Sequence, residues 1–177
     1  MGFSDSSVLL KIALVILPLA LILHIVGLAT PSWSAISVSV AGVSASQSIG
    51  LWSTCGTTAG NTECVSFDDV PNLEVSDWLK ACRAFGIIGV LAVAAAAILA
   101  VLCTVALSKD SHKIAYILAT VIAFVGAAAC ILSCIIWAGK VDDLIAGLDL
   151  SYSFALSIVA GVLAGIGGIL EAIDLCK

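Results

Sequence analysis

Two cysteines in a polar stretch are the residues of this chain best suited to redox or cross-linking chemistry. Cys55 and Cys64 have eight residues between them, and small or polar side chains flank both. Thiol oxidoreductases place only two residues between their reactive cysteines. A longer spacing suits a bridge between neighbouring strands that are joined by a turn. The pattern therefore favours a structural disulfide formed in an oxidising compartment, with a redox-active pair as the alternative.

The other cysteines do not suggest a metal site or an enzyme. They are scattered through hydrophobic stretches, where a free cysteine behaves as a small apolar residue. They are Cys82, Cys103, Cys130, Cys134 and Cys176. We therefore expect no metal, no cofactor and no catalytic activity.

A run of acids around and after Cys64 is the second group with chemical potential. Carboxylates that line a narrow, water-filled passage attract cations and repel anions. The alternative is a solvated acidic surface that keeps this stretch soluble. Three of the acids are candidate ion-selectivity residues, and the cysteine bridge would hold the first of them in place. These three are Glu63, Asp68 and Asp69, followed by Glu74 and Asp77.

Hydrophobic composition decides which elements position these groups. Of the 177 residues 62% are hydrophobic and only 11% are charged, whereas a soluble domain carries about 25% charged residues. This composition predicts an integral membrane protein. Its net charge of −5 does not suggest a nucleic-acid partner, and we expect none. Four blocks are long enough to cross a bilayer as helices, at about 8–28, 84–107, 114–137 and 152–173. The first is too long for a cleaved signal peptide, so we expect it to be retained.

The charges favour one orientation of these spans. Eight of the twelve acids and the pair Cys55 and Cys64 fall in the two loops at about 29–82 and 138–151. The positive-inside rule leans the same way. We therefore expect a multi-pass plasma-membrane protein with both termini in the cytoplasm and both of these loops outside the cell.

The first loop alternates in a way that is typical of strands with one wet face. Alternation covers 36–40 and 43–46, a third strand is expected over 49–55, and a short one over 64–67, after a turn at 56–63. The segment 70–80 suggests a short helix that leads into the second span. Arg83 lies at the outer edge of that span, where we expect it to fix the loop to the bundle.

With these residues laid out, the sequence resembles the claudin family and its wider tetraspan superfamily, which includes epithelial membrane proteins, peripheral myelin protein and TARP auxiliary subunits. The resemblance rests on Trp33, the tripeptide Gly50, Leu51 and Trp52, the pair Cys55 and Cys64, and Arg83. It implies a membrane α+β fold. In this fold a four-helix transmembrane bundle carries an extracellular antiparallel β-sheet from the first loop, with one strand from the second. Trp52 and its neighbours would anchor the sheet at the membrane surface.

The resemblance also implies a function. Members of this family associate with themselves, laterally and across the intercellular gap, and with other claudins, at tight junctions. We therefore expect a cell–cell junction protein that forms a paracellular barrier or a cation-favouring pathway. The alternative is an auxiliary or membrane-organising subunit that binds a channel or receptor laterally. Candidate self-association residues, placed where the family makes lateral contacts, are Val70, Leu73, Leu144, Ile145 and Leu148.

Two further expectations concern association. The small-xxx-small spacing of Gly161 and Gly165 suits close helix packing within the bundle, with homodimerisation as the alternative. The residues after the fourth span, Leu175, Cys176 and Lys177, do not form a PDZ-binding motif. Direct binding to a PDZ scaffold is therefore not expected.

Overall fold

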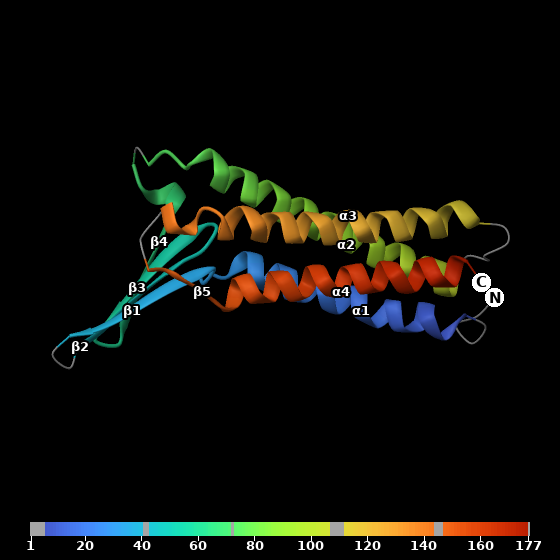
Figure 1. Cartoon of the computed structure of the whole chain (residues 1–177), viewed down its shortest axis with the longest axis horizontal. Helices are drawn as coiled ribbons and strands as arrows, with labels where there is room; N and C mark the ends of the chain where they lie inside the picture. The colour runs from blue at the N-terminus through green and yellow to red at the C-terminus, as the bar shows by residue number, and fades with distance from the viewer. Residues whose placement is uncertain (1–5, 41–42, 72, 107–111, 144–146, 177) are drawn as a thin grey trace.

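Four long helices run side by side along the long axis of the molecule (Figure 1). The structure is a computed structural model, and it describes residues 6–40, 43–71, 73–106, 112–143 and 147–176. Within that part the helices are α1 (Val8–Ala29), α2 (Asp77–Val105), α3 (Lys113–Ala138) and α4 (Tyr152–Leu175). All four are long and apolar enough to cross a membrane. Both chain termini lie at the end of the bundle away from the sheet.

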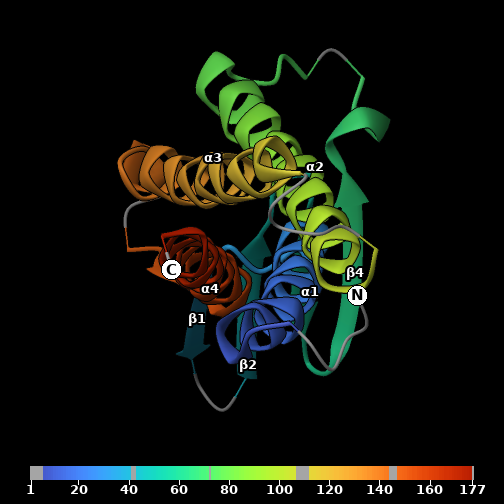
Figure 2. The same ribbon diagram turned by 90° about the vertical axis from the view of Figure 1, so that its right-hand side faces the viewer.

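Small residues allow these helices to pack closely. A Cβ added to Gly126 would lie 2.7 Å from a methyl of Val93, and one added to Gly167 would lie 2.7 Å from Leu17. Gly161 faces Ile131 of α3 at 2.8 Å by the same measure. Ile131 of α3 therefore covers the face of Gly161 inside the bundle, and that face is not available to a second copy. The end view in Figure 2 shows α3 between α2 and α4, and α4 beside α1.

The loop between α1 and α2 forms an antiparallel sheet, as the sequence predicts. Its strands are β1 (Ser34–Val40), β2 (Val43–Ile49), β3 (Ser53–Thr58) and β4 (Asn61–Ser66), and β5 (Asp149–Leu150) comes from the second loop. The order across the sheet is β4-β3-β2-β1-β5. The predicted membrane α+β fold is therefore confirmed.

Two of the predicted strand boundaries are wrong. The third strand begins at Ser53 rather than Ile49, because the chain turns at residues 50–52, where the Gly50 amide donates to the Ser53 carbonyl at 2.9 Å. The expected long turn at 56–63 shortens to Ala59 and Gly60, both of which have positive φ angles. Such a pair builds the tight hairpin that matches the twist of its strands.

The predicted short helix over 70–80 is also wrong. A single turn of 3-10 helix, η2 (Phe67–Asp69), comes earlier, and α2 begins at Asp77 with Ser76 as its N-cap. Helix α2 thus extends 29 residues and reaches beyond the predicted second span toward the sheet. Val70 and Leu73 consequently lie in the irregular segment between η2 and α2, where the Leu73 amide donates to the Val70 carbonyl at 3.3 Å.

Candidate functional site at the base and on the face of the sheet

A buried aromatic cluster joins the sheet to the bundle. Trp33 is fully buried, and its ring centroid lies 5.4 Å from that of Trp137 and 6.1 Å from that of Phe154. Trp78 meets Trp137 from the other side at 5.8 Å. Tilted and edge-on pairs of this kind stabilise a core beyond the area they bury. The cluster holds the first strand, the end of α3 and the start of α4 together.

Three indole N–H groups in this region, those of Trp33, Trp52 and Trp137, have hydrogen-bond partners. Trp33 Nε1 donates to the Gly27 carbonyl at 2.8 Å, and Trp52 Nε1 donates to the Leu28 carbonyl at 3.0 Å. These carbonyls belong to the last turn of α1, where no intrahelical amide remains to satisfy them. Trp137 Nε1 donates to Ser34 Oγ at 2.9 Å. The tryptophans therefore position the sheet by directed bonds as well as by burial.

The tripeptide Gly50, Leu51 and Trp52 forms the turn that faces this cluster. Leu51 is fully buried. Gly50 packs on Pro31 so closely that an added Cβ would lie 2.5 Å from the Pro31 Cα. Only glycine fits there, because the obstructing atom belongs to the backbone and cannot rotate away.

Arg83 is the cation that connects α2 to this turn. Its Nε donates to the Leu51 carbonyl at 2.8 Å. Its guanidinium lies 4.7 Å from the centre of the Trp52 ring and 5.8 Å from that of Phe67. A guanidinium held over aromatic faces is stabilised by their negative quadrupole. Arg83 thus fixes the loop to the bundle through a carbonyl and two rings.

The predicted disulfide is present. Cys55 and Cys64 are directly opposite partners in the β3–β4 ladder, with an S–S distance of 2.04 Å. The Cys55 side is buried and the Cys64 side is exposed. The five remaining cysteines are unpaired, four of them buried in the bundle and Cys176 exposed. The bridge therefore closes the outer hairpin of the sheet.

Replacing both bridge cysteines, as Cys55→Ser with Cys64→Ser, is expected to destabilise the sheet by about 2–3 kcal/mol, from the chain entropy released in so short a loop. Thermal unfolding of the purified protein in detergent measures this effect, with the exposed Cys176→Ser as the matched control. An unchanged unfolding temperature for the double variant would contradict the stabilising role.

The candidate selectivity acids fall in two places. Glu63 lies on one face of the sheet and lines an open groove of about 620 Å³. The other groove residues are uncharged: Gln47, Thr54, Gly56, Thr58, Ala59, Asn61 and Val65. Asp68 and Asp69 are both exposed on η2, off the sheet. The structure therefore gives the groove a single charge, and that charge is negative.

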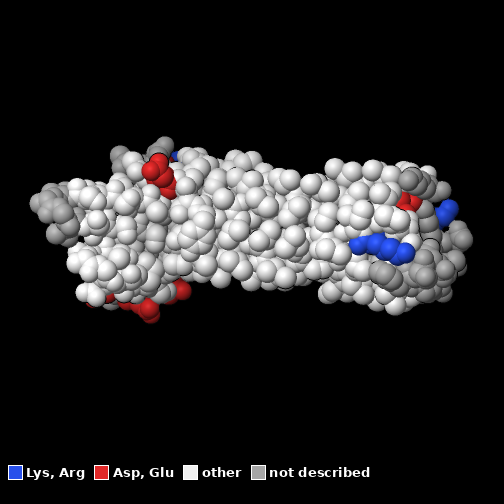
Figure 3. All heavy atoms as spheres, turned by 90° about the horizontal axis from the view of Figure 1, so that it is seen from below, with Lys and Arg blue, Asp and Glu red and all other residues white. Residues whose placement is uncertain are grey.

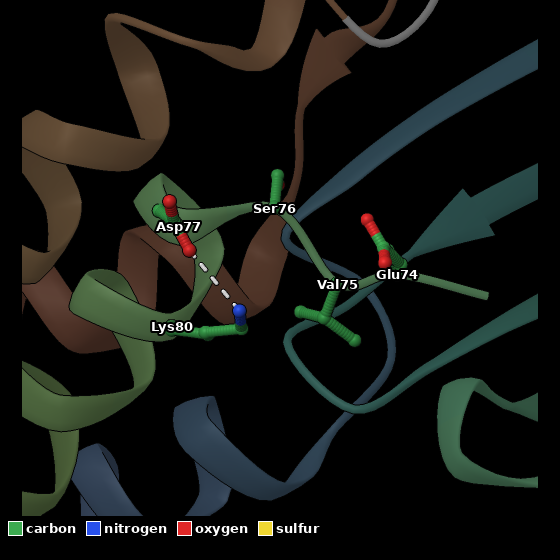
Figure 4. Close-up of a pocket in the computed structure, with 5 residues that line it drawn as sticks. All are labelled: Glu74, Val75, Ser76, Asp77 and Lys80. Atoms are coloured by element: carbon green, nitrogen blue, oxygen red, sulfur yellow. Dashed lines mark hydrogen bonds and ion pairs between the residues drawn. The ribbon is translucent and has the colours of Figure 1, made fainter. Parts of the chain in front are cut away.

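The remaining acids near α2 form a second hollow, shown in Figure 4. Glu74, Val75, Ser76 and Asp77 line it together with Lys80. Lys80 Nζ contacts Asp77 Oδ1 at 3.0 Å, the dashed line in Figure 4. At the second loop, Lys140 likewise contacts Asp143 at 2.9 Å. Lys80 and Lys140, both exposed, are thus neutralised locally. On the face seen in Figure 3 this end of the molecule is mostly uncharged, and its charged patches are chiefly acidic.

The candidate self-association residues separate into three groups. Val70 and Leu73 are 38% and 47% exposed on the segment before α2. Leu148 is only 6% exposed and packs in the aromatic cluster, so its side chain is not open to a neighbouring copy. Leu144 and Ile145 lie outside the described residues.

Several contributors to the site carry no signal in the sequence alone. The Gly27 and Leu28 carbonyls and the Ser34 hydroxyl act only through the folded chain, so residue type did not reveal them.

Glu171 in α4, outside this site, is 4% exposed, and neither of its carboxyl oxygens has a hydrogen-bond partner in the structure. It lies near the opposite end of the bundle. Among the described residues, no cluster of three or more His, Cys, Asp or Glu is arranged to hold a metal ion.

Comparison with known proteins places these features in one family. The model of the PMP-22/EMP/MP20/Claudin family matches residues 6–171, which is nearly the whole chain. The match spans all the strands and the residues of the aromatic cluster. No curated protein matches the chain.

Proposed function

Because the chain belongs to the PMP-22/EMP/MP20/Claudin family, we propose that this multi-pass membrane protein is a non-enzymatic cell–cell junction protein. In this proposal it associates with itself into strands, and it forms a paracellular barrier with a cation-favouring pathway. The observation that carries the proposal is the groove on the sheet whose single charged lining residue is Glu63.

Orientation is part of the proposal. The disulfide Cys55–Cys64 needs an oxidising compartment, which supports placing the sheet outside the cell. Lys11 and Lys113 lie toward the end of the bundle that carries the termini. The positive-inside rule supports placing that end in the cytoplasm.

The charge balance supports cation preference. Around the sheet, Lys80 and Lys140 are each paired with an aspartate, and Arg83 is engaged with Leu51 and the aromatic rings. The acids Glu63, Asp68 and Asp69 have no such cation among the described residues. A passage bounded by this surface attracts cations and repels chloride.

Two surface features support the proposed association into strands. The sheet ends in unpaired strand edges, which favour pairing with another chain. Val70 and Leu73 add exposed apolar side chains on the neighbouring segment, where lateral contacts between copies would bury them. Leu144 and Ile145 remain lateral-contact candidates in the second loop.

The test is the ratio of sodium to chloride permeability across an epithelial monolayer that expresses the protein. Glu63→Gln is expected to lower this ratio by roughly two-fold or more, because it removes the one charge of the groove. Glu74→Gln is the matched control, since Glu74 is an exposed acid of the same end that lines a different hollow.

An unchanged ratio for Glu63→Gln would refute charge selection by the groove. If the wild-type protein alters neither permeability nor resistance, but co-purifies with a channel or receptor in one membrane, the auxiliary-subunit function replaces the junction function.

A further inference from the structure

Strand β1 has a second edge that its neighbour covers only in part. On this side β5 pairs with Ser34 and Ala35 alone. The Ser151 amide donates to the Trp33 carbonyl at 2.9 Å. This bond shows that the Trp33 carbonyl points toward the β5 side of β1. Backbone groups in an antiparallel strand alternate sides, so those of Ser37 and Ser39 point to the same side as the Trp33 carbonyl, whereas the Trp33 amide donates to Ile49 of β2. No strand among the described residues pairs with them there.

The chain bends away where this edge becomes free. Before β5, Gly147 has a φ of 87°, a conformation that takes the backbone off the line of the strand. A groove of about 410 Å³ remains beside β1, lined in part by Ala35, Ile36 and Asp149. Among the described residues, none pairs with the outer half of β1 on this side.

This edge also lacks the features that normally keep strand edges apart. From Thr30 to Thr62 the sequence contains no Asp, Glu, Lys, Arg or His, and neither β1 nor β2 contains proline. Charged side chains and prolines are the usual protection of an edge. Between the two free serines stands Val38, which is 52% exposed. An exposed valine in the middle of an unprotected edge is typical of a pairing surface.

Resting on the proposed junction function, we propose that β1 pairs antiparallel with β1 of a second copy in the facing membrane, about a two-fold axis at Val38. Ser37 of each copy then lies opposite Ser39 of the other, and each such pair exchanges two backbone hydrogen bonds. The two Val38 side chains meet at the axis as a non-hydrogen-bonded pair, about 4.5 Å apart between Cα atoms. A two-fold contact of this kind is self-complementary.

The ends of the strands fit this register. With Ser37 opposite Ser39, Val40 of the second copy lies opposite Ile36. Asp149 of β5 lies opposite Ala35, the next residue along. Because Asp149 already lies opposite Ala35, the pairing is limited to residues 37–39, and the incoming strand leaves the ladder at Val40.

The direction of β1 sets the relative placement of the two membranes. β1 leads from the base of the sheet away from the helical bundle (Figure 1). Rotating a copy about an axis through Val38 reverses this direction, so the second bundle lies beyond the opposite end of the strand pair. Because each exchanged hydrogen bond adds only a modest net stabilisation, one pair of copies binds weakly, and arrays of copies supply the adhesion.

Cross-linking of full-length Val38→Cys between two cell populations carrying different tags tests this pairing. After mixing and mild oxidation, we expect a disulfide-linked dimer that contains both tags. The opposed cysteines would have the geometry of the Cys55–Cys64 pair, whose Cα atoms are 4.0 Å apart. Ala45→Cys is the matched control: it is exposed and neighbours Val38 in the ladder, but the two copies of Ala45 lie about 14 Å apart in the proposed pair.

A second variant separates pairing from folding. Ser39→Pro removes one outward amide, together with the exposed hydroxyl contact between Ser39 and Ser44, and leaves the β1–β2 ladder bonds of the even-numbered residues in place. We expect it to reach the cell surface and to lose at least ten-fold in binding between cells. If cells carrying the wild-type protein bind one another, two results would each overturn this inference and leave the junction function standing. One is the absence of the Val38→Cys dimer, and the other is unchanged binding by Ser39→Pro. Absence of wild-type binding between cells would overturn the junction function as well.

Discussion

Arg83→Gln is expected to destabilise the protein by about 3–5 kcal/mol. The substitution removes a charged hydrogen bond to the Leu51 carbonyl, worth about 1.5–3 kcal/mol. It also removes a partly desolvated cation from the Trp52 ring, worth about 2 kcal/mol. The carbonyl that Arg83 serves belongs to a fully buried residue and would remain unpaired. We expect a large fall in the unfolding temperature and poor delivery to the cell surface.

Two controls isolate the contact from the charge. Arg83→Lys keeps the positive charge but loses the planar group that stacks on the rings, so it should recover only part of the stability. Lys80→Gln removes an exposed cation one turn earlier on α2, whose ion pair with Asp77 is also exposed, and should change stability by less than about 1 kcal/mol. Equal losses from Arg83→Gln and Lys80→Gln would contradict the role given to Arg83.

Gly50→Ala is expected to cost about 3 kcal/mol or more, which is the upper range for forcing an extra methyl into a packed site. The new Cβ would lie 2.5 Å from the Pro31 Cα and 3.0 Å from the Thr30 carbonyl oxygen. Both obstacles are backbone atoms, so relief requires moving the turn at residues 50–52. That movement would pull Leu51 from the core and the Trp52 indole from its bond to α1. Thermal unfolding in detergent measures the loss.

Gly56→Ala is the matched control for this prediction. Gly56 lies in β3, and a Cβ added there would meet no atom within 4 Å. We expect it to be neutral or to stabilise by up to about 1 kcal/mol, because alanine restricts the unfolded chain. If both alanine variants were tolerated equally, the tight contact of Gly50 with Pro31 would not explain the motif.

Hydrophobic length and strand alternation were sufficient to predict the layers of this fold. Four apolar blocks predicted four helices, and period-two alternation predicted a sheet between the first two. The cysteine spacing pointed to the bridge that joins β3 and β4. These features depend on local composition, which a sequence displays directly.

The boundaries that went wrong depend on contacts between distant residues. The third strand starts late because Gly50 packs on Pro31 and Leu51 enters the core, and neither contact is visible in a local pattern. The expected helix at 70–80 merged into α2, which begins at Asp77 behind its Ser76 cap. Leu148 was a candidate self-association residue because it lies in the second loop, where the family makes lateral contacts, yet it completes the aromatic cluster. The hydrogen bonds of Trp33 and Trp52 likewise required the folded end of α1.

The central claim is that this protein joins cells by associating with copies of itself. The most direct measurement is its distribution in cells that lack junction strands, when tagged expressing cells are mixed with non-expressing ones. The account predicts strong enrichment at contacts where both cells express the protein, and none where only one does. A uniform surface distribution, or equal enrichment against non-expressing neighbours, would contradict it.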